Sequence, residues 1–205
     1  MFIALEGVDT SGKSTQIMLL KEAYPHAIFT KEPGGTKLGQ ALRQKVLYEN
    51  LSLDTQFLLF LADRALHLEE VLKPNLHQLI FSDRSLISGL AYAPYPLEQA
   101  LDLHRVHGLL EVLPNCVFVL KLPPQALKER LHAKTHDFIE SRGLEFLERT
   151  QERLLQACAL LGVCTYILDA SLSPQGLNTK ILKSLKGMGA FCAFTKDLHN
   201  SCQNL

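Results

Sequence analysis

Near the start of the chain lies the stretch Gly7-Val8-Asp9-Thr10-Ser11-Gly12-Lys13-Ser14, which has the glycine spacing and the Lys-Ser ending of a phosphate-binding loop. Glycines let the backbone curl so that several N–H groups point at one anion, and the positive end of the following helix faces the same anion. Lys13 can neutralise phosphate charge, and the Ser14 hydroxyl can ligate Mg²⁺. An apolar run at 2–5 predicts a strand before the loop, and residues 15–21 predict a helix after it. This context favours a phosphate-binding loop over a chance Gly-rich turn.

The length and charge of the chain narrow the classes of protein to consider. With 205 residues, one domain with a full core is expected. The formal net charge is zero, so nothing global suggests a nucleic-acid or membrane partner. No apolar run is long enough to span a bilayer, and Glu6 and Asp9 interrupt the N-terminal segment, so no signal peptide is expected. The five cysteines are scattered without a Cys-x-x-Cys motif, which favours free thiols in the cytoplasm.

Eight histidines raise the question of a transition-metal site. His132 and His136 have i,i+4 spacing, and His104 and His107 have i,i+3 spacing. Neither pair lies in a carboxylate–histidine motif, so no transition-metal site is expected.

Short apolar runs alternate with helical patterns along the rest of the chain. The predicted strands cover residues 2–5, 27–30, 79–82, 117–120 and 163–168. The predicted helices cover residues 15–21, 36–47, 53–73, 97–110, 125–131, 144–161 and 174–185. Thr36 and either Ser52 or Asp54 are the expected caps of the second and third helices, and Pro74 is the expected end of the third. This alternation predicts an α/β domain over 1–186, with a parallel five-stranded sheet and helices on both faces. No pattern assigns a structure to the tail at 187–205.

Ligands of such sheets bind at the carboxyl ends of the strands, where the loops at 7–14, 31–36 and 83–92 should form one cleft. Asp83 and Arg84 follow an apolar strand directly, which suits a carboxylate near Mg²⁺ and a guanidinium near phosphate. The alternative is a helix-capping Asp83 beside a surface ion pair.

Two further groups of residues suggest binding, each with a plainer alternative. Phe60 and Arg64 lie four residues apart on a predicted helix, so a planar base could stack on the ring and accept a hydrogen bond from the guanidinium. By pattern alone, a core phenylalanine and a surface arginine are favoured. Arg130, His132, Lys134 and His136 form a basic stretch between two helices, which is either a lid over triphosphate or an ordinary exposed loop.

Taken together, the motifs resemble those of the bacterial thymidylate kinase family over about residues 1–186. They are the phosphate loop, Thr30-Lys31-Glu32-Pro33-Gly34-Gly35-Thr36, Phe60-Leu61-Ala62-Asp63-Arg64, Asp83-Arg84, Ala91-Tyr92 and Asp137-Phe138-Ile139-Glu140. The Glu-Pro-Gly-Gly-Thr segment is the most specific of them, since the phosphate loop alone fits many NTPases. The resemblance implies a P-loop nucleoside-monophosphate kinase fold, transfer of the γ-phosphoryl of ATP to dTMP with Mg²⁺ on the way to dTTP, and a homodimer.

The resemblance also implies a role for individual residues. Asp9 would hold the nucleotide sugar and help to organise the metal, Phe60 would stack on thymine, and Arg64 would donate to its 4-oxo group. Arg84 would bridge the acceptor phosphate and the moving phosphoryl, and Tyr92 would lie under the deoxyribose. The remaining assignments are ATP binding by Gly7, Val8, Asp9, Thr10, Ser11, Gly12, Lys13, Ser14 and Thr15, metal binding by Asp9, Ser14 and Asp83, and substrate binding also by Lys31, Arg84 and Ser88.

The chain departs from the family pattern at several positions. Ser85 follows Asp-Arg where Tyr or His is usual, Gly89 stands where a polar side chain commonly faces the pyrimidine N3, and Ala93-Pro94 replaces Gln-Gly. Lys31 replaces an arginine and loses its forked geometry. Phe138 replaces the arginine of the lid motif, and Thr10 is not the loop arginine of one family branch. The remaining candidates for a catalytic lid cation are Arg130, Lys134 and Arg142, with Arg130 favoured.

Three other functions are considered. A GTPase-like switch would need Asn-Lys-x-Asp, and the chain has neither that motif nor an Asp-x-x-Gly outside the phosphate loop. A catalytically weakened P-loop nucleotide-binding protein is suggested by Phe138 and Gly89. Another nucleoside or nucleoside-monophosphate kinase is the alternative within enzymes.

Overall fold

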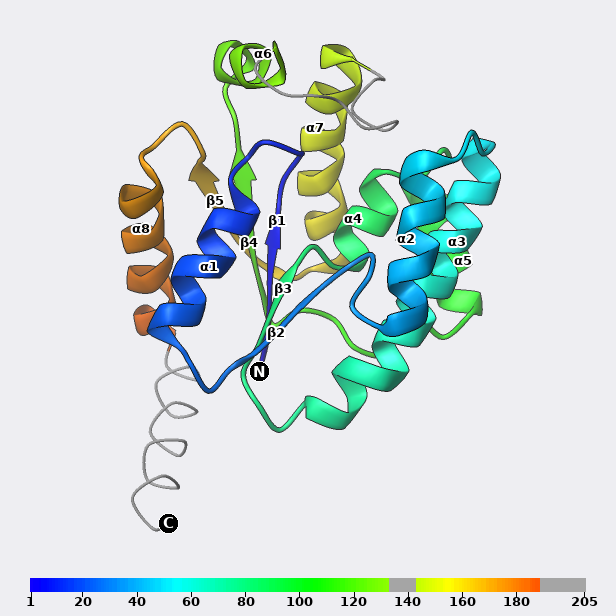
Figure 1. Ribbon diagram of the computed structural model, residues 1–205, viewed down its shortest axis with the longest axis horizontal. Coiled ribbons are helices and arrows are strands. Elements are labelled where there is room, and N and C mark those ends of the chain that lie inside the picture. Colours follow the sequence, from blue (N-terminus) through cyan, green and yellow to red (C-terminus); the bar gives the residue numbers. More distant parts are fainter. Residues whose placement is uncertain (133–142, 189–205) are drawn as a thin grey trace.

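The computed structural model describes residues 1–132 and 143–188, which form a parallel five-stranded sheet covered by helices on both faces (Figure 1). The strands are β1 (Phe2–Glu6), β2 (Ile28–Lys31), β3 (Ile80–Asp83), β4 (Cys116–Lys121) and β5 (Cys164–Asp169). Their order is β2-β3-β1-β4-β5, and every neighbouring pair is parallel. The predicted fold class is therefore confirmed, and β1, which leads into the phosphate loop, is the central strand.

Eight α-helices lie in the described part of the chain: α1 (Lys13–Ala23), α2 (Lys37–Tyr48), α3 (Leu53–His67), α4 (Leu86–Ala91), α5 (Leu97–Val106), α6 (Pro124–His132), α7 (Leu144–Leu161) and α8 (Pro174–Gly187). The alternation of β1 explains the two faces. Ile3 and Leu5 pack on the face covered by α1 and α8, whereas Ala4 packs in the cluster formed with α3, α4, α5 and α7 (Figure 1). None of these helices is long and apolar enough to cross a membrane.

Two of the predicted helix caps are observed. The Thr36 hydroxyl accepts a hydrogen bond from Gly39 N at 2.9 Å, and the Ser52 hydroxyl accepts one from Thr55 N at 3.2 Å. Ser52, and not Asp54, is thus the cap of α3. Such a cap typically contributes about 1 kcal/mol.

Two predicted helix ends were wrong. The α-helix α3 ends at His67, and the chain continues as a π turn at Leu68–Leu72 and a 3₁₀ turn at Lys73–Asn75. Pro74 lies in the first turn of the latter, where its missing N–H is tolerated. Helix α5 ends at Val106, before Gly108 in a left-handed conformation with φ +69°.

The segment 83–92, predicted as a loop, contains α4. The Ser85 hydroxyl caps this helix by accepting a hydrogen bond from Ile87 N at 3.2 Å, so Ser85 and not Asp83 is the cap. A helix of six residues with Ser88-Gly89 in its middle is too short to show a 3.6-residue period.

Most of the predicted lid and tail lies outside the described residues. This applies to 133–142, and so to Lys134, His136, Phe138 and Arg142, and to 189–205. Gly187 ends α8, and Met188 packs against the core.

Candidate active site

The phosphate loop joins β1 to α1 at the carboxyl edge of the sheet. Gly7 has φ +152°, and a Cβ there would lie 2.8 Å from the carbonyl oxygen of Leu120, which only glycine avoids. Gly12, at φ +94°, precedes α1, so the N-terminus of that helix faces the loop. The geometry is that of an anion-binding turn.

Lys13 is folded back over this loop. Its Nζ donates to the carbonyl oxygen of Val8 at 2.9 Å, and its side chain is buried. Burial lowers the pKa of Lys13 to about 8, with Arg84 acting in the same direction and Asp9 and Asp83 opposing it. A bound phosphate would favour the charged form, because an adjacent anion raises the pKa of an amine.

Ser14 and Asp83 supply oxygen ligands beside the loop. Ser14 Oγ donates to Asp83 Oδ2 at 3.1 Å, while Asp83 Oδ1 is buried without a hydrogen-bond partner among the described residues. A hydroxyl and a carboxylate oxygen suit Mg²⁺, which usually takes one or two protein ligands together with phosphates and water. No cluster of three or more His, Cys, Asp or Glu side chains that could hold a metal occurs in residues 1–132 and 143–188. Asp9, the third predicted metal ligand, forms an ion pair with Arg84 through Oδ1 at 2.6 Å.

Arg84 connects the phosphate loop to α4. Its Nη2 donates to Asp9 Oδ1 at 2.6 Å, and its Nη1 donates to the Gly7 carbonyl oxygen at 2.9 Å and to Ser88 Oγ at 3.2 Å. The guanidinium also lies 5.2 Å from the centre of the Tyr92 ring. Although burial opposes it, the surrounding Tyr92 and carboxylates raise the pKa of Arg84 well above its ordinary value. The site therefore has a permanent cation next to the phosphate loop.

Glu6 anchors the start of α4, a role that the sequence analysis missed. Its two carboxylate oxygens accept hydrogen bonds from Ser85 Oγ at 2.7 Å and Ser88 Oγ at 2.6 Å. Burial raises the pKa of Glu6 to about 7. The available signal was a carboxylate at the end of an apolar strand, immediately before the loop.

A cavity opens beside Arg84. It is lined by Asp9, Glu32, Pro33, Arg43, Leu47, Phe60, Asp63, Arg64, Arg84, Ser85, Leu86, Ser88, Gly89, Tyr92 and His104. Six of the seven predicted substrate-binding residues line it, and Lys31 does not, because it is exposed at the end of β2. Residues from the phosphate loop, α3 and α4 are thus brought to one cavity although they are distant in sequence.

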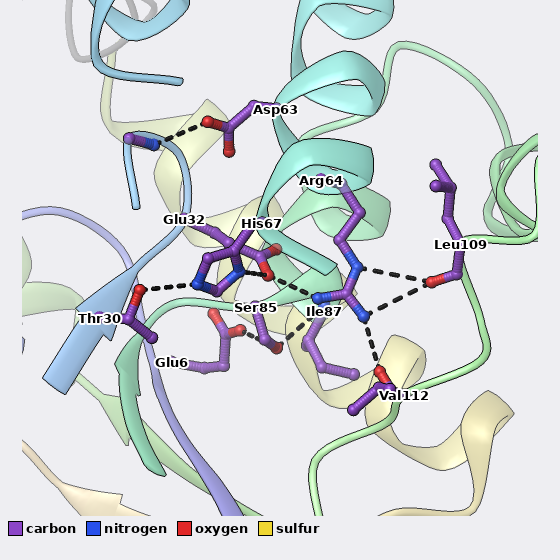
Figure 2. A network of polar contacts seen from close by, with 11 residues as sticks. Glu6, Thr30, Glu32, Asp63, Arg64, His67, Ser85, Ile87, Leu109 and Val112 are labelled. Atoms are coloured by element: carbon purple, nitrogen blue, oxygen red, sulfur yellow. Dashed lines mark hydrogen bonds and ion pairs between the residues drawn. The ribbon is translucent and has the colours of Figure 1, made fainter. Parts of the chain in front are cut away.

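Arg64 is held rigidly at this cavity by a buried polar network (Figure 2). Its Nη1 donates to Glu32 Oε1 at 2.5 Å, and its Nη2 donates to the Val112 carbonyl oxygen at 2.6 Å. The residue is only 2% exposed, so the surface position favoured by the helical pattern alone was wrong. Nη1 carries a second hydrogen for which the described residues supply no hydrogen-bond acceptor.

Glu32 is the counterion that makes this burial possible. Besides Arg64, it lies 2.5 Å from His67 Nδ1, and His67 Nε2 lies 2.7 Å from Thr30 Oγ1 (Figure 2). Burial alone would raise the pKa of Glu32, but Arg64 and His67 outweigh it and lower the pKa overall. Glu32 and His104 line the cavity, and His67 pairs with Glu32 behind it. None of the three was assigned to the site from the sequence, because only the packing of α3 and α5 brings them there.

Arg130, on α6, contacts the backbone of the phosphate loop. Its Nη1 donates to the Thr10 carbonyl oxygen and its Nη2 to the Ala170 carbonyl oxygen, both at 2.9 Å. The guanidinium thus holds the backbone of the loop in this structure. The other two candidates for a lid cation, Lys134 and Arg142, lie outside the described residues.

Comparison with known proteins agrees with this geometry. The family model described as Thymidylate kinase matches residues 5–181. The chain is 52% identical to a thymidylate kinase of Wolinella succinogenes, covering 91% of this chain and all of that protein, and 45% identical to one of Aliarcobacter butzleri, covering 88% and 96%. The crystal structure of thymidylate kinase from Ehrlichia chaffeensis superposes with a TM-score of 0.71 at 24% identity, covering 91% of this chain and 98% of that one, and so shows the shared fold. With its phosphate loop, its adjoining cavity and these relatives, the chain belongs to the thymidylate kinase family.

Proposed function

We propose that the protein transfers the γ-phosphoryl group of ATP to dTMP, forming dTDP on the way to dTTP. The observation that carries this proposal is the cavity in which Arg84, beside the phosphate loop, and Phe60 and Arg64, suited to a base, line the same space. Membership of the thymidylate kinase family supports it. A nucleoside monophosphate in this cavity would have its phosphate directed toward the loop that holds ATP.

The roles of the charged residues follow from the chemistry of phosphoryl transfer. Negative charge is spread over the oxygens of the moving phosphoryl, while two anions must approach each other in line. Lys13 at the loop and Arg84 between loop and cavity would neutralise that charge. Ser14 and Asp83 would hold Mg²⁺, which supplies further charge neutralisation when bound with ATP. A strong base is not needed, because the acceptor phosphate is already an anion.

The wider assignments also stand as proposals. The chain would act as a single kinase domain, predicted over 1–186 and extended to Met188 by the end of α8 and its packing on the core. A lid around 132–141 and a tail over the remaining residues to 205 would complete it, and the protein would be a homodimer in the cytoplasm. Free cysteine thiols support the location, since Cys116, Cys158 and Cys164 form no disulfide in the described structure. The homodimer rests on the resemblance to the family alone.

Selectivity for dTMP is the first prediction. Arg64 can only donate hydrogen bonds, so it suits the 4-oxo group of thymine and not the 4-amino group of cytosine. In an assay of ADP release with ATP and a panel of nucleosides and nucleoside monophosphates, kcat/KM for dTMP should exceed that for dCMP by roughly 100-fold or more, because the wrong base leaves a buried donor unpaired. A value for dCMP equal to or above that for dTMP would refute the substrate. Binding of ATP and dTMP without ADP release would instead indicate a weakened nucleotide-binding protein.

Arg130 supplies a second prediction. Arg130→Ala should lower kcat by about 10- to 100-fold, because the loop that holds ATP loses both a positive charge and a backbone anchor. Dissociation of dTMP, measured without ATP, should change little. Wild-type kcat for Arg130→Ala, and likewise for Lys134→Ala and Arg142→Ala, would show that no lid cation from this segment is needed.

A further inference from the structure

His104, on α5, is a buried side chain with a defined tautomer. It is 2% exposed, and its Nδ1 lies 2.8 Å from the carbonyl oxygen of Ala100. A carbonyl oxygen can only accept, so Nδ1 carries the hydrogen of the neutral ring. The other nitrogen, Nε2, then presents a lone pair and is a hydrogen-bond acceptor.

This acceptor faces the cavity at Gly89. Both residues line the cavity, and a Cβ at Gly89 would lie only 3.1 Å from His104 Nε2. Nε2 has no hydrogen-bond partner among the described residues. Because Nε2 faces the cavity and receives no hydrogen bond from the described residues, it is suited to a donor that arrives with the ligand.

The surroundings keep the ring neutral. Burial lowers the pKa of His104, with Arg64 and His107 acting in the same direction and the hydrogen bond to Ala100 and the charge of Glu32 opposing. Arg64 and His104 both line the same cavity. The cavity therefore offers a hydrogen-bond acceptor, His104 Nε2, and a hydrogen-bond donor, the Arg64 guanidinium.

We propose that His104 Nε2 accepts a hydrogen bond from the N3–H of the pyrimidine, while Arg64 donates to the neighbouring 4-oxo oxygen. The inference rests on the proposed function and names a residue that determines base specificity. Thymine and uracil present a donor at N3 beside an acceptor at position 4. Cytosine presents the opposite pair, so it would be mismatched at both His104 and Arg64. The absence of a side chain at Gly89 leaves the space through which the imidazole reaches the base.

The proposed hydrogen bond to N3 is tested by comparing the turnover of dTMP with that of N3-methyl-dTMP. The analogue lacks the N3 hydrogen and carries a methyl group in its place. In the wild type, kcat/KM should favour dTMP by roughly 100-fold or more, because the methyl group both removes the donor and meets the imidazole. In His104→Ala this ratio should fall at least about 10-fold, because the methyl can occupy the vacated space, and dTMP alone should lose about 10-fold. The matched control is His107→Ala, an exposed histidine near the same helix end, which should keep the wild-type ratio.

Gly89→Ala provides a second variant that does not remove the buried ring. Its methyl group would press on Nε2 at 3.1 Å, and alanine suits a helix better than glycine, so the protein should fold. Its preference for dTMP over dCMP should fall several-fold. Equal turnover of dTMP and its N3-methyl analogue by the wild type would overturn the role of His104 and leave the proposed function intact. Undiminished discrimination in His104→Ala or in Gly89→Ala would do the same. Absence of dTMP turnover in the wild type would instead overturn the proposed function.

Discussion

Lys13→Ala is expected to abolish phosphoryl transfer, with a fall in kcat on the order of 10³-fold or more. Lys13 is the cation of the phosphate loop, and its Nζ is held over the loop by the Val8 carbonyl oxygen at 2.9 Å. Without it, the charge that develops on the phosphoryl oxygens has no compensating group at this position. ADP release with saturating ATP and dTMP measures the effect.

The fold should survive this substitution. Lys13 is buried and its pKa is lowered by that burial, so the folded state gains little from its charge. Thermal unfolding of Lys13→Ala should therefore occur at or near the wild-type temperature. Lys21→Ala, an exposed lysine of the same helix, is the matched control and should keep full activity. Near-normal turnover in a folded Lys13→Ala protein would contradict the assignment of the phosphate loop.

Arg84→Ala is expected to lower kcat by a similar factor, about 10³-fold. The guanidinium contacts Gly7 in the phosphate loop, Asp9 and Ser88, so one planar group spans the space between loop and cavity. Arg84→Lys should recover only a small part of the loss, because an ammonium is a point charge without the forked geometry. Both variants are compared with the wild type by ADP release.

The control for Arg84 is Arg105→Ala, which removes an exposed arginine on α5 and should leave kcat unchanged. Arg84 has φ +71°, a conformation equally unfavourable for alanine and lysine, so both variants should have similar unfolding temperatures. Full activity in Arg84→Lys would mean that a charge alone is sufficient, and full activity in Arg84→Ala would exclude Arg84 from the reaction.

Local patterns were sufficient to predict much of this structure. The glycine spacing of the phosphate loop, the apolar runs that became strands, and the cap at Thr36 each depend on a few neighbouring residues. The parallel sheet then follows from alternation, and it brings the carboxyl ends of β1 and β3 together. That is why Ser14 and Asp83, far apart in sequence, could be expected to meet, as they do at 3.1 Å.

The remainder depends on tertiary packing that no local pattern encodes. Arg64 looked like a surface residue by helical spacing, yet it is buried because Glu32 from the end of β2 neutralises it. Helix α4 has too few residues for a visible period, and Glu6 stabilises its start from the adjacent strand. His104 reaches the cavity only because α5 packs beside α4 and because Gly89 has no side chain.

If this site moves a phosphoryl group from ATP to dTMP, that group can be followed from one nucleotide to the other. With ATP labelled at the γ-phosphate, Mg²⁺ and dTMP, the wild-type protein should transfer the label to dTDP in a one-to-one ratio with ADP formed. Lys13→Ala should form no labelled dTDP above background. Release of the label as inorganic phosphate, or its transfer to another nucleotide in preference to dTMP, would show that the protein is not a dTMP kinase.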